Sequence, residues 1–100
     1  MIRTLADDTT RDIWNGMNSK AARRIPKSLW PAVRRKLDQV DSVTKLGDLL
    51  VPPGNRLHAL EGNLSGLHAI RVNDQYRLIF RFEGRNAHDV RCTDYHQGRV

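Results

Sequence analysis

Three β-prone runs separated by two short turn signals fill residues 67–96, and this arrangement constrains the fold more than any other feature of the sequence. Turn signals between alternating runs are typical of consecutive β-hairpins. In the middle run, alternate positions form an apolar set made of Tyr76, Leu78, Phe80 and Phe82. The positions between them are Arg77, Ile79 and Arg81. We therefore predict antiparallel strands with one face buried against helices and the other presenting guanidinium groups to solvent or a ligand.

The N-terminal part of the chain combines a strand-like run with a short helix. Residues 1–5 predict a short edge strand. Acids and threonines at positions 7–10 supply N-cap candidates and favourable first-turn charges for a helix from about Thr10 to Trp14. Gly16 is suited to end that helix.

A longer helix is predicted to begin with Ser28 as its N-cap and Pro31 in its first turn. Its buried stripe would consist of Leu29 or Trp30, Val33, Leu37 and Val40. A shorter helix would then restart at Asp41 or Ser42. That helix would hold Val43, Leu46, Leu49 and Leu50.

A turn and a short strand follow the helices. Residues 51–55 contain two prolines followed by glycine, which fixes a turn, and residues 56–60 predict a strand. The element order is then β-α-α-β-β-β-β, without repeats or a linker. We predict one α+β domain over residues 1–100, with two N-terminal helices packed on one side of a mainly antiparallel twisted sheet.

The charge balance is strongly basic, with 17 lysine and arginine residues against 11 acids and a net charge of +6. Such a balance favours a polyanionic partner, nucleic acid before others, although an ordinary basic domain is the alternative. Between the predicted helices, Lys20, Arg23 and Arg24 lie in a loop that could follow a phosphate backbone. A solvated connection is an equally weighted explanation of that loop.

The single cysteine, Cys92, excludes an internal disulfide and a cysteine-based zinc site, and its place in a strand run predicts a small buried hydrophobe. No apolar run approaches the roughly 20 residues that span a membrane. The N-terminus lacks the features of a signal peptide, so we expect the cytoplasm. The spacing of histidines and aspartates matches no metal site, and we predict neither a metal nor another cofactor.

Several motifs occur in an order seen in one family of toxins. They are Pro52-Pro53-Gly54-Asn55-Arg56-Leu57, the loop from Gly62 to Gly66, the run 70–80 and Asp94-Tyr95-His96. With these motifs the chain resembles, over nearly its whole length, HigB-type toxins of the RelE/ParE superfamily of bacterial type II toxin–antitoxin systems. The resemblance implies a microbial-RNase-like fold and ribosome-dependent cleavage of mRNA that inhibits translation and growth. It also implies neutralisation by a cognate helix-turn-helix antitoxin, in a heterotetramer of two toxins and two antitoxins.

Metal-independent RNA cleavage needs a base for the ribose 2′-OH, an acid for the leaving 5′-oxygen and a donor for the charged phosphate oxygens. Histidine suits both proton roles and arginine suits the third. The residues that the resemblance assigns to catalysis are His58, Arg77, Asp94, Tyr95 and His96. Arg77 would hold the phosphate, while the two histidines would share the base and acid roles in an order that stays open. Asp94 would orient an imidazole, and Tyr95 would stack on a base or donate to phosphate.

Each of these residues also has a plain structural explanation. His58 could be an ordinary half-exposed strand residue, which spacing alone favours. Arg77 could form a purely structural ion pair with Asp94. Tyr95 could belong to the core, and His96 could be a frayed terminal residue.

A second group of residues is predicted to bind RNA or the ribosome without doing chemistry. Its members are Lys20, Arg23, Arg24, Arg56, Arg71 and Arg81. Glu61 departs from the family pattern, because some relatives carry lysine near this position and an acid repels phosphate. Only Tyr95 and Trp30 remain as candidate stacking platforms for bases, so we expect the ribosome to hold the mRNA in place.

Two other functions compete with the endoribonuclease. A toxin of the same fold could poison DNA gyrase without catalysis, and a plain RNA-binding module is a weaker alternative. A protein that only binds has no need for two candidate proton-transfer histidines, so His58 and His96 favour the nuclease. Growth arrest on expression would distinguish a toxin from an RNA-binding module.

Overall fold

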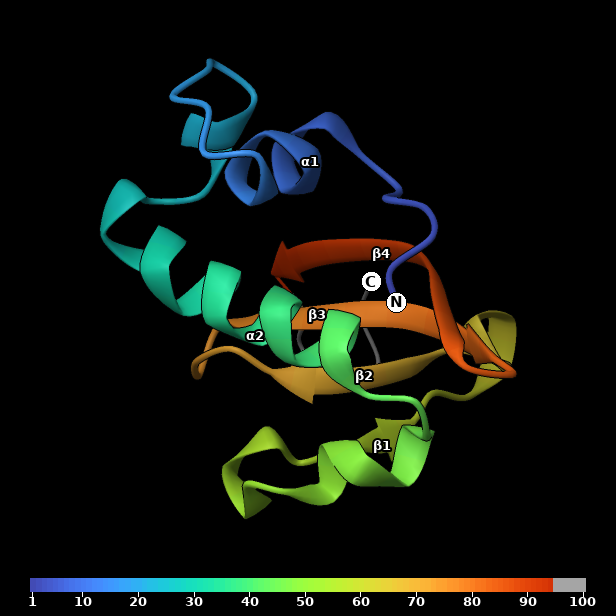
Figure 1. Cartoon of the computed structure of the whole chain (residues 1–100). Coiled ribbons are helices and arrows are strands. Elements are labelled where there is room, and N and C mark those ends of the chain that lie inside the picture. Colours follow the sequence, from blue (N-terminus) through green and yellow to red (C-terminus); the bar gives the residue numbers. More distant parts are fainter. Residues whose placement is uncertain (95–100) are drawn as a thin grey trace.

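The alternating run at the centre of the sequence forms the third strand of one antiparallel sheet, which the computed structural model describes within residues 1–94. In sheet order the strands are β1 (His58–Ala59), β2 (His68–Arg71), β3 (Tyr76–Glu83) and β4 (Asn86–Asp94). Helix α2 (Trp30–Ser42) crosses one face of the sheet, and helix α1 (Asp8–Trp14) lies beside β4 (Figure 1). Two helices and a four-stranded antiparallel sheet confirm the predicted α+β class. No helix in the described part of the chain is long and apolar enough to cross a membrane.

Short 3₁₀ segments connect these elements. They comprise Ala22–Arg24, Lys27–Leu29, Leu46–Leu50, Pro53–Asn55 and Gly62–Leu64. The predicted helix that would restart at Asp41 or Ser42 is wrong, because α2 itself continues through both residues. Its expected apolar positions are instead divided, since Leu49 is fully buried while Leu50 is 59% exposed.

The N-terminal segment runs along the outer edge of β4, but not as the continuous strand that the sequence predicted. It forms two isolated parallel bridges, which pair Ile2 with Ala87 and Leu5 with Val90. The backbone N–H of Ile2 also donates to a carboxylate oxygen of Asp41 at 2.8 Å. Asp41 therefore fastens the N-terminal segment to the end of α2.

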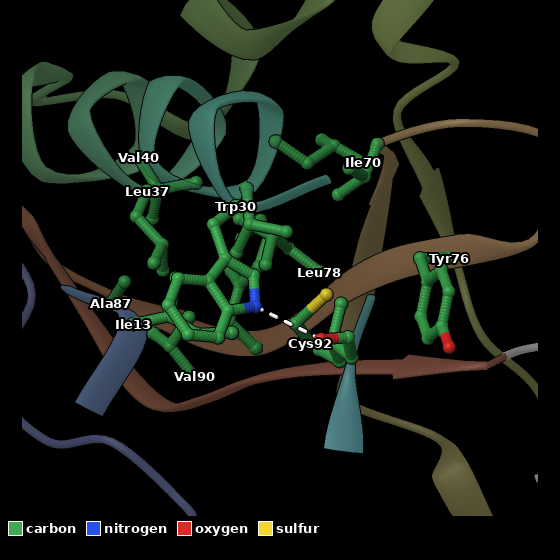
Figure 2. Close-up of a cluster of buried hydrophobic side chains, with 14 of the residues drawn as sticks. Ile13, Trp30, Leu37, Val40, Ile70, Tyr76, Leu78, Ala87, Val90 and Cys92 are labelled. Carbon is green, nitrogen blue, oxygen red and sulfur yellow. Dashed lines mark hydrogen bonds between the residues drawn. The ribbon is translucent and has the colours of Figure 1, made fainter. Parts of the chain in front are cut away.

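The main core lies between the two helices and the sheet face that α2 covers. The predicted stripe of α2 is buried, and it consists of Trp30, Val33, Leu37 and Val40. Figure 2 shows the Trp30 indole packed among side chains from the sheet and α1, including Ile13, Leu78, Val90 and Cys92. The indole N–H donates to the Ile25 carbonyl at 2.9 Å. The expectation that Trp30 could stack on a base is therefore wrong, because the residue is buried and only 5% exposed.

Helix α1 begins with the capping contact that the sequence favoured. Asp7 is the N-cap, and its carboxylate accepts the backbone N–H of Thr10 at 2.8 Å. The hydroxyl oxygen of Thr10 in turn accepts the backbone N–H of Cys92 at 2.9 Å, which joins α1 to β4. Cys92 is a free, buried cysteine, as predicted, and burial raises the pKa of its thiol to about 12.

The start of α2 differs from the expectation. Ser28 does not cap the helix, because it lies inside a 3₁₀ turn that leads directly into it. Leu29 occupies the N-cap position and makes no side-chain capping hydrogen bond. The N–H of Trp30 donates to the Lys27 carbonyl of that turn, so a backbone group replaces the expected side-chain cap.

A second, smaller apolar cluster covers the middle of the opposite sheet face. It is formed by Leu60, Ala69 and Ile79, with Leu64 and Leu67 packed against them. Ile79 was predicted to face solvent or a ligand between two arginines, and it is instead 1% exposed. The loop between β1 and β2 therefore divides this face, leaving Arg77 and Arg81 on either side of the cluster.

Candidate functional site

Neighbouring strands bring arginine side chains to one end of the sheet. Arg71 on β2 lies directly opposite Arg77 on β3, and Arg77 lies opposite Thr93 on β4. Opposed residues share a face, so Arg71, Arg77 and Thr93 lie on the same side of the sheet. Arg77 is two positions from Ile79, which places this side as the one that α2 does not cover. Two opposed guanidinium groups repel each other, so this end of the sheet favours an anion.

An acidic side chain already lies at this basic end. Asp74, in the turn between β2 and β3, forms an ion pair with Arg71. The hydrogen bond and the charge of Arg71 lower the pKa of Asp74, and the charges of Arg56 and Arg77 lower it further. Three arginines from separate parts of the chain therefore act on one exposed carboxylate, which shows that their fields converge there.

The guanidinium of Arg77 is tied to the turn before its own strand. It donates to the backbone carbonyl of Asn73 and, at 3.1 Å, to that of Tyr76. The side-chain oxygen of Asn73 accepts the backbone N–H groups of Gln75 at 2.9 Å and Tyr76 at 2.7 Å, which orders this turn. The turn thus holds the guanidinium in place without help from a ligand.

Arg56 and His58 approach the same end from the edge of the sheet. Arg56 has a left-handed backbone, with φ of 50° and ψ of 48°. The Nδ1 atom of the exposed His58 ring lies 2.8 Å from the Arg56 carbonyl oxygen. A carbonyl only accepts, so this contact requires a proton on Nδ1 and makes Nε2 the acceptor of a neutral ring. His58 pairs with Ala69, two positions before Arg71, and so shares the face of the arginines.

Asp94 lies at the same end of the sheet but on the other face by strand alternation. It pairs in register with Tyr76, whose side chain belongs to the main core. One carboxylate oxygen of Asp94 accepts the side-chain N–H of Gln75 at 2.9 Å. Burial, followed by the negative charge of Asp94, raises the pKa of Tyr76. Tyr95 and His96, the other predicted catalytic residues, lie outside the described residues.

The predicted binding residues fall in three places. Arg56 and Arg71 lie beside Arg77, as described above. The exposed side chains of Lys20, Arg23 and Arg24 lie in and before the 3₁₀ segment Ala22–Arg24, which packs beside α1. Arg81 lies four residues beyond Arg77 on β3, about 13 Å along the strand. It forms ion pairs with Glu83 and Asp89 there.

Sequence reasoning missed two cations near the site. Arg91 on β4 pairs with Ile79 and therefore lies on the same sheet face as Arg77. Lys36 on α2 was not among the predicted site residues, and its pKa is lowered by burial first and then by the charges of Arg35 and Arg71. The pattern of alternation could have identified Arg91 if the strand register had been known. No local signal marks the contacts of Lys36 with other elements, which are its hydrogen bond to Asn55 and the charge of Arg71.

No group of three or more His, Cys, Asp or Glu side chains among residues 1–94 could hold a metal ion. The prediction of a site that works without a metal stays a prediction. The arrangement offers two guanidinium groups held by the turn between β2 and β3, and one histidine whose Nδ1 contact makes Nε2 the acceptor of the neutral ring. Such groups can bind a phosphodiester and exchange a proton with a hydroxyl group beside it.

Comparisons with known proteins identify the family. A family model described as HigB-like toxin, a RelE-like toxin of the type II toxin–antitoxin system HigB, matches residues 5–96. Over 65 residues the chain is 51% identical to Toxin HigB-1 of Vibrio cholerae, in an alignment that covers 65% of this chain and 68% of that protein.

Two solved structures share the fold. The YoeB-YefM complex from Staphylococcus aureus contains a chain 16% identical to this one, with a TM-score of 0.59 and coverage of 96% of this chain and 98% of that chain. A mutant of YafQ from E. coli is 14% identical, with a TM-score of 0.62 and coverage of 94% and 93%. Likeness at such low identity shows the fold alone, whereas the family model spans nearly the whole sequence. The chain accordingly belongs to the HigB family of RelE-like toxins of type II toxin–antitoxin systems.

Proposed function

We propose that this chain is a ribosome-dependent mRNA endoribonuclease that works without a metal ion, acts in the cytoplasm and inhibits translation and growth. The observation that carries this proposal is the register that sets Arg71 opposite Arg77, on the sheet face that also bears His58. A sheet that fixes two guanidinium groups beside an imidazole suits a phosphodiester. Membership of the HigB family supports the toxin part of the proposal.

The reaction transfers two protons and exchanges one bond at phosphorus. A base takes the proton of the ribose 2′-OH, and the 2′-oxygen attacks phosphorus to form a 2′,3′-cyclic phosphate. The bond to the 5′-oxygen breaks, and an acid protonates that oxygen. Arg77 stabilises the charge on the phosphate oxygens. His58 and His96 supply the base and the acid, Asp94 orients an imidazole, and Tyr95 stacks on a base or donates to phosphate.

The hydrogen bond of His58 bears on its assignment. Donation from Nδ1 to the Arg56 carbonyl leaves Nε2 as the acceptor in the neutral ring, which is what a general base requires. The carbonyl also fixes the ring orientation. This supports His58 as a proton acceptor, while the order of roles between His58 and His96 stays open.

Dependence on the ribosome is supported by the scarcity of surface aromatics. Trp30 is buried, Tyr76 is 8% exposed, and Phe80 is fully buried. Trp14 and Phe82 pack against the main core. Stacking on an exposed aromatic side chain contributes about 1–3 kcal/mol per base. The described part of this chain therefore has few side chains that could bind single bases by stacking. Positioning of the mRNA by the ribosome could supply roughly 7–11 kcal/mol of the activation barrier to cleavage.

A labelled transcript incubated with the protein, with and without translating ribosomes, tests the proposal. We expect cuts within codons only in the translating sample, because free RNA is not positioned. Attack by the 2′-oxygen leaves 5′-hydroxyl ends, which a polynucleotide kinase labels without prior phosphatase treatment. Cleavage of free RNA at the same rate would indicate a free-standing ribonuclease. Products with 5′-phosphate ends would contradict the mechanism. Gyrase inhibition without any cleavage would favour the non-catalytic toxin instead.

The proposed partner is a cognate helix-turn-helix antitoxin, in a heterotetramer of two toxins and two antitoxins. Membership of a toxin–antitoxin family supports an antitoxin, and the related fold in the YoeB-YefM complex is consistent with one. Co-expression with the product of a neighbouring reading frame should restore growth. Light scattering of the purified complex should give the mass of two copies of each chain, and a mass of one copy of each would contradict this stoichiometry.

A further inference from the structure

A buried asparagine lies directly before the two site residues that come from the edge of the sheet. Asn55 is fully buried at the end of the Pro53–Asn55 segment. Its side-chain oxygen accepts from the ammonium of Lys36 at 2.6 Å. Its side-chain nitrogen donates to the side chain of Gln39 at 2.9 Å and to the carbonyl of Leu49 at 3.1 Å. An amide buried without such partners would be strongly unfavourable, so these contacts hold Asn55 in one position.

The backbone around Asn55 is equally defined. Its N–H donates to the Pro52 carbonyl at 2.9 Å, and the N–H of Arg56 donates to the Pro53 carbonyl at 3.1 Å. Arg56 then adopts its left-handed conformation, which residues other than glycine adopt only where the surroundings enforce it. Strand β1 follows and is only two residues long, so its own ladder contributes little to its placement.

We propose that Asn55 is a positioning residue, whose ties to α2 through Lys36 and Gln39 hold Arg56 and His58 beside Arg71 and Arg77. The helix is the rigid reference, because α2 packs its whole apolar stripe into the main core. Arg71 and Arg77 are held independently by the turn between β2 and β3. The site is therefore assembled from two separately anchored halves, and Asn55 fixes one half relative to the other.

The electrostatics agree with this geometry. The charge of Arg71 reaches Lys36 from the sheet, and the charge of Arg56 reaches Asp74 in the turn. Charges from the helix, the edge segment and the turn therefore influence one another. A shift of the edge segment would change the distance between His58 and the arginines rather than remove any of them.

The activity part of the test rests on the proposed function, whereas the structural part does not. Asn55→Ala should accelerate hydrogen exchange at the amides of residues 55 and 56, because their local opening becomes easier. Cleavage of translated mRNA at saturating ribosome concentration should fall about 100-fold, since a misplacement of about 1 Å can cost that much. Lys36→Met and Gln39→Ala each remove one tie, and they should give smaller changes in both measurements.

Asp41→Ala is the matched control. It also removes a tie between α2 and another segment, but at the opposite end of the sheet, where Asp41 holds Ile2. It should accelerate exchange at Ile2, lower the thermal midpoint and leave cleavage unchanged below that midpoint. The proposal would be overturned if Asn55→Ala cleaved mRNA as well as Asp41→Ala does. It would also be overturned if the amide of Arg56 exchanged in Asn55→Ala at the wild-type rate.

These readouts separate two failures. A wild-type protein that does not cleave would refute the proposed function, and the exchange rates at Asn55 and Arg56 would still decide the positioning role. If Asn55→Ala does not fold, the two single-tie variants decide the matter. Unchanged cleavage and unchanged exchange in both would overturn the proposal, and the graded loss described above would support it.

Discussion

Arg71 and Arg77 lie directly opposite each other across β2 and β3, and both guanidinium groups are held by the turn that joins these strands. Arg71 pairs with Asp74, and Arg77 donates to the carbonyl of Asn73. Opposed like charges are normally unfavourable in a sheet. Their preorganisation therefore lowers the cost of binding an anion, because little side-chain freedom is left to lose.

Loss of the phosphate-binding arginine should abolish toxicity. We expect Arg77→Ala and His96→Ala each to remove growth inhibition, with cleavage reduced about 100- to 1000-fold for the arginine, as for other donors to a transition-state oxyanion. Arg77→Lys should recover little, because an ammonium cannot form the planar two-pronged contact. Circular dichroism should show an unchanged fold. Wild-type growth arrest by both alanine variants would refute the catalytic assignment.

The loop beside α1 should add affinity for ribosomal RNA without doing chemistry. Neutralising Lys20, Arg23 and Arg24 should weaken co-sedimentation with ribosomes and reduce its dependence on salt, because each lost phosphate contact lowers the slope by about one. A double variant of Arg3 and Arg85, at the far end of the sheet, removes two charges outside the loop, and its effect per charge removed is the control for net charge. Identical salt curves for wild type and the loop variant would rule out the loop as a contact.

Arg91 should contribute to substrate binding, although no motif marked it. It shares the sheet face of Arg77, and its guanidinium adds positive charge there. Arg91→Ala should reduce cleavage efficiency by about tenfold, roughly the value of one exposed charge-assisted contact. Arg85→Ala removes the same charge from the turn between β3 and β4 and should have no effect. Equal kinetics for the two variants would count against Arg91.

The thiol of Cys92 should be inert in the folded protein. Burial raises its pKa from 9.0 to about 12, so the folded state retains a proton that the unfolded state loses at lower pH. The contribution to stability is therefore fully present below about pH 9 and declines as the pH rises towards 12. Urea titrations across this range should show the decline, and Cys92→Ala should flatten it. Rapid alkylation of the native protein by iodoacetamide would contradict this prediction.

The strands could be predicted because their signals are local. Alternation in β3 separated the core residues Tyr76, Leu78 and Phe80 from the arginines, and this division holds in the structure. The cap of α1 was among the predicted candidates, because Asp7 bonds to a backbone group only three residues away. Hydrophobic periodicity and helix capping depend only on residues that are close in the sequence.

Features that depend on distant contacts were missed. The cover over Ile79 comes from a loop whose leucines gave no periodic signal. The place of Arg91 depends on a register that shifts between Ile79 and Arg81, and on the positive φ of Asp89 within β4. Lys36 gained its role from Asn55, which is 19 residues away. These relations arise on packing, so patterns within a short window could not contain them.

The pairing of the N-terminal segment with β4 has a practical consequence for handling the protein. The terminal amine donates to the carbonyl of Arg85, in the turn between β3 and β4. That turn lies at the opposite end of β3 from Arg77, about 25 Å away along an extended strand. An affinity handle or a surface linkage attached at Met1 would therefore project away from the arginines and leave their face accessible to a large particle.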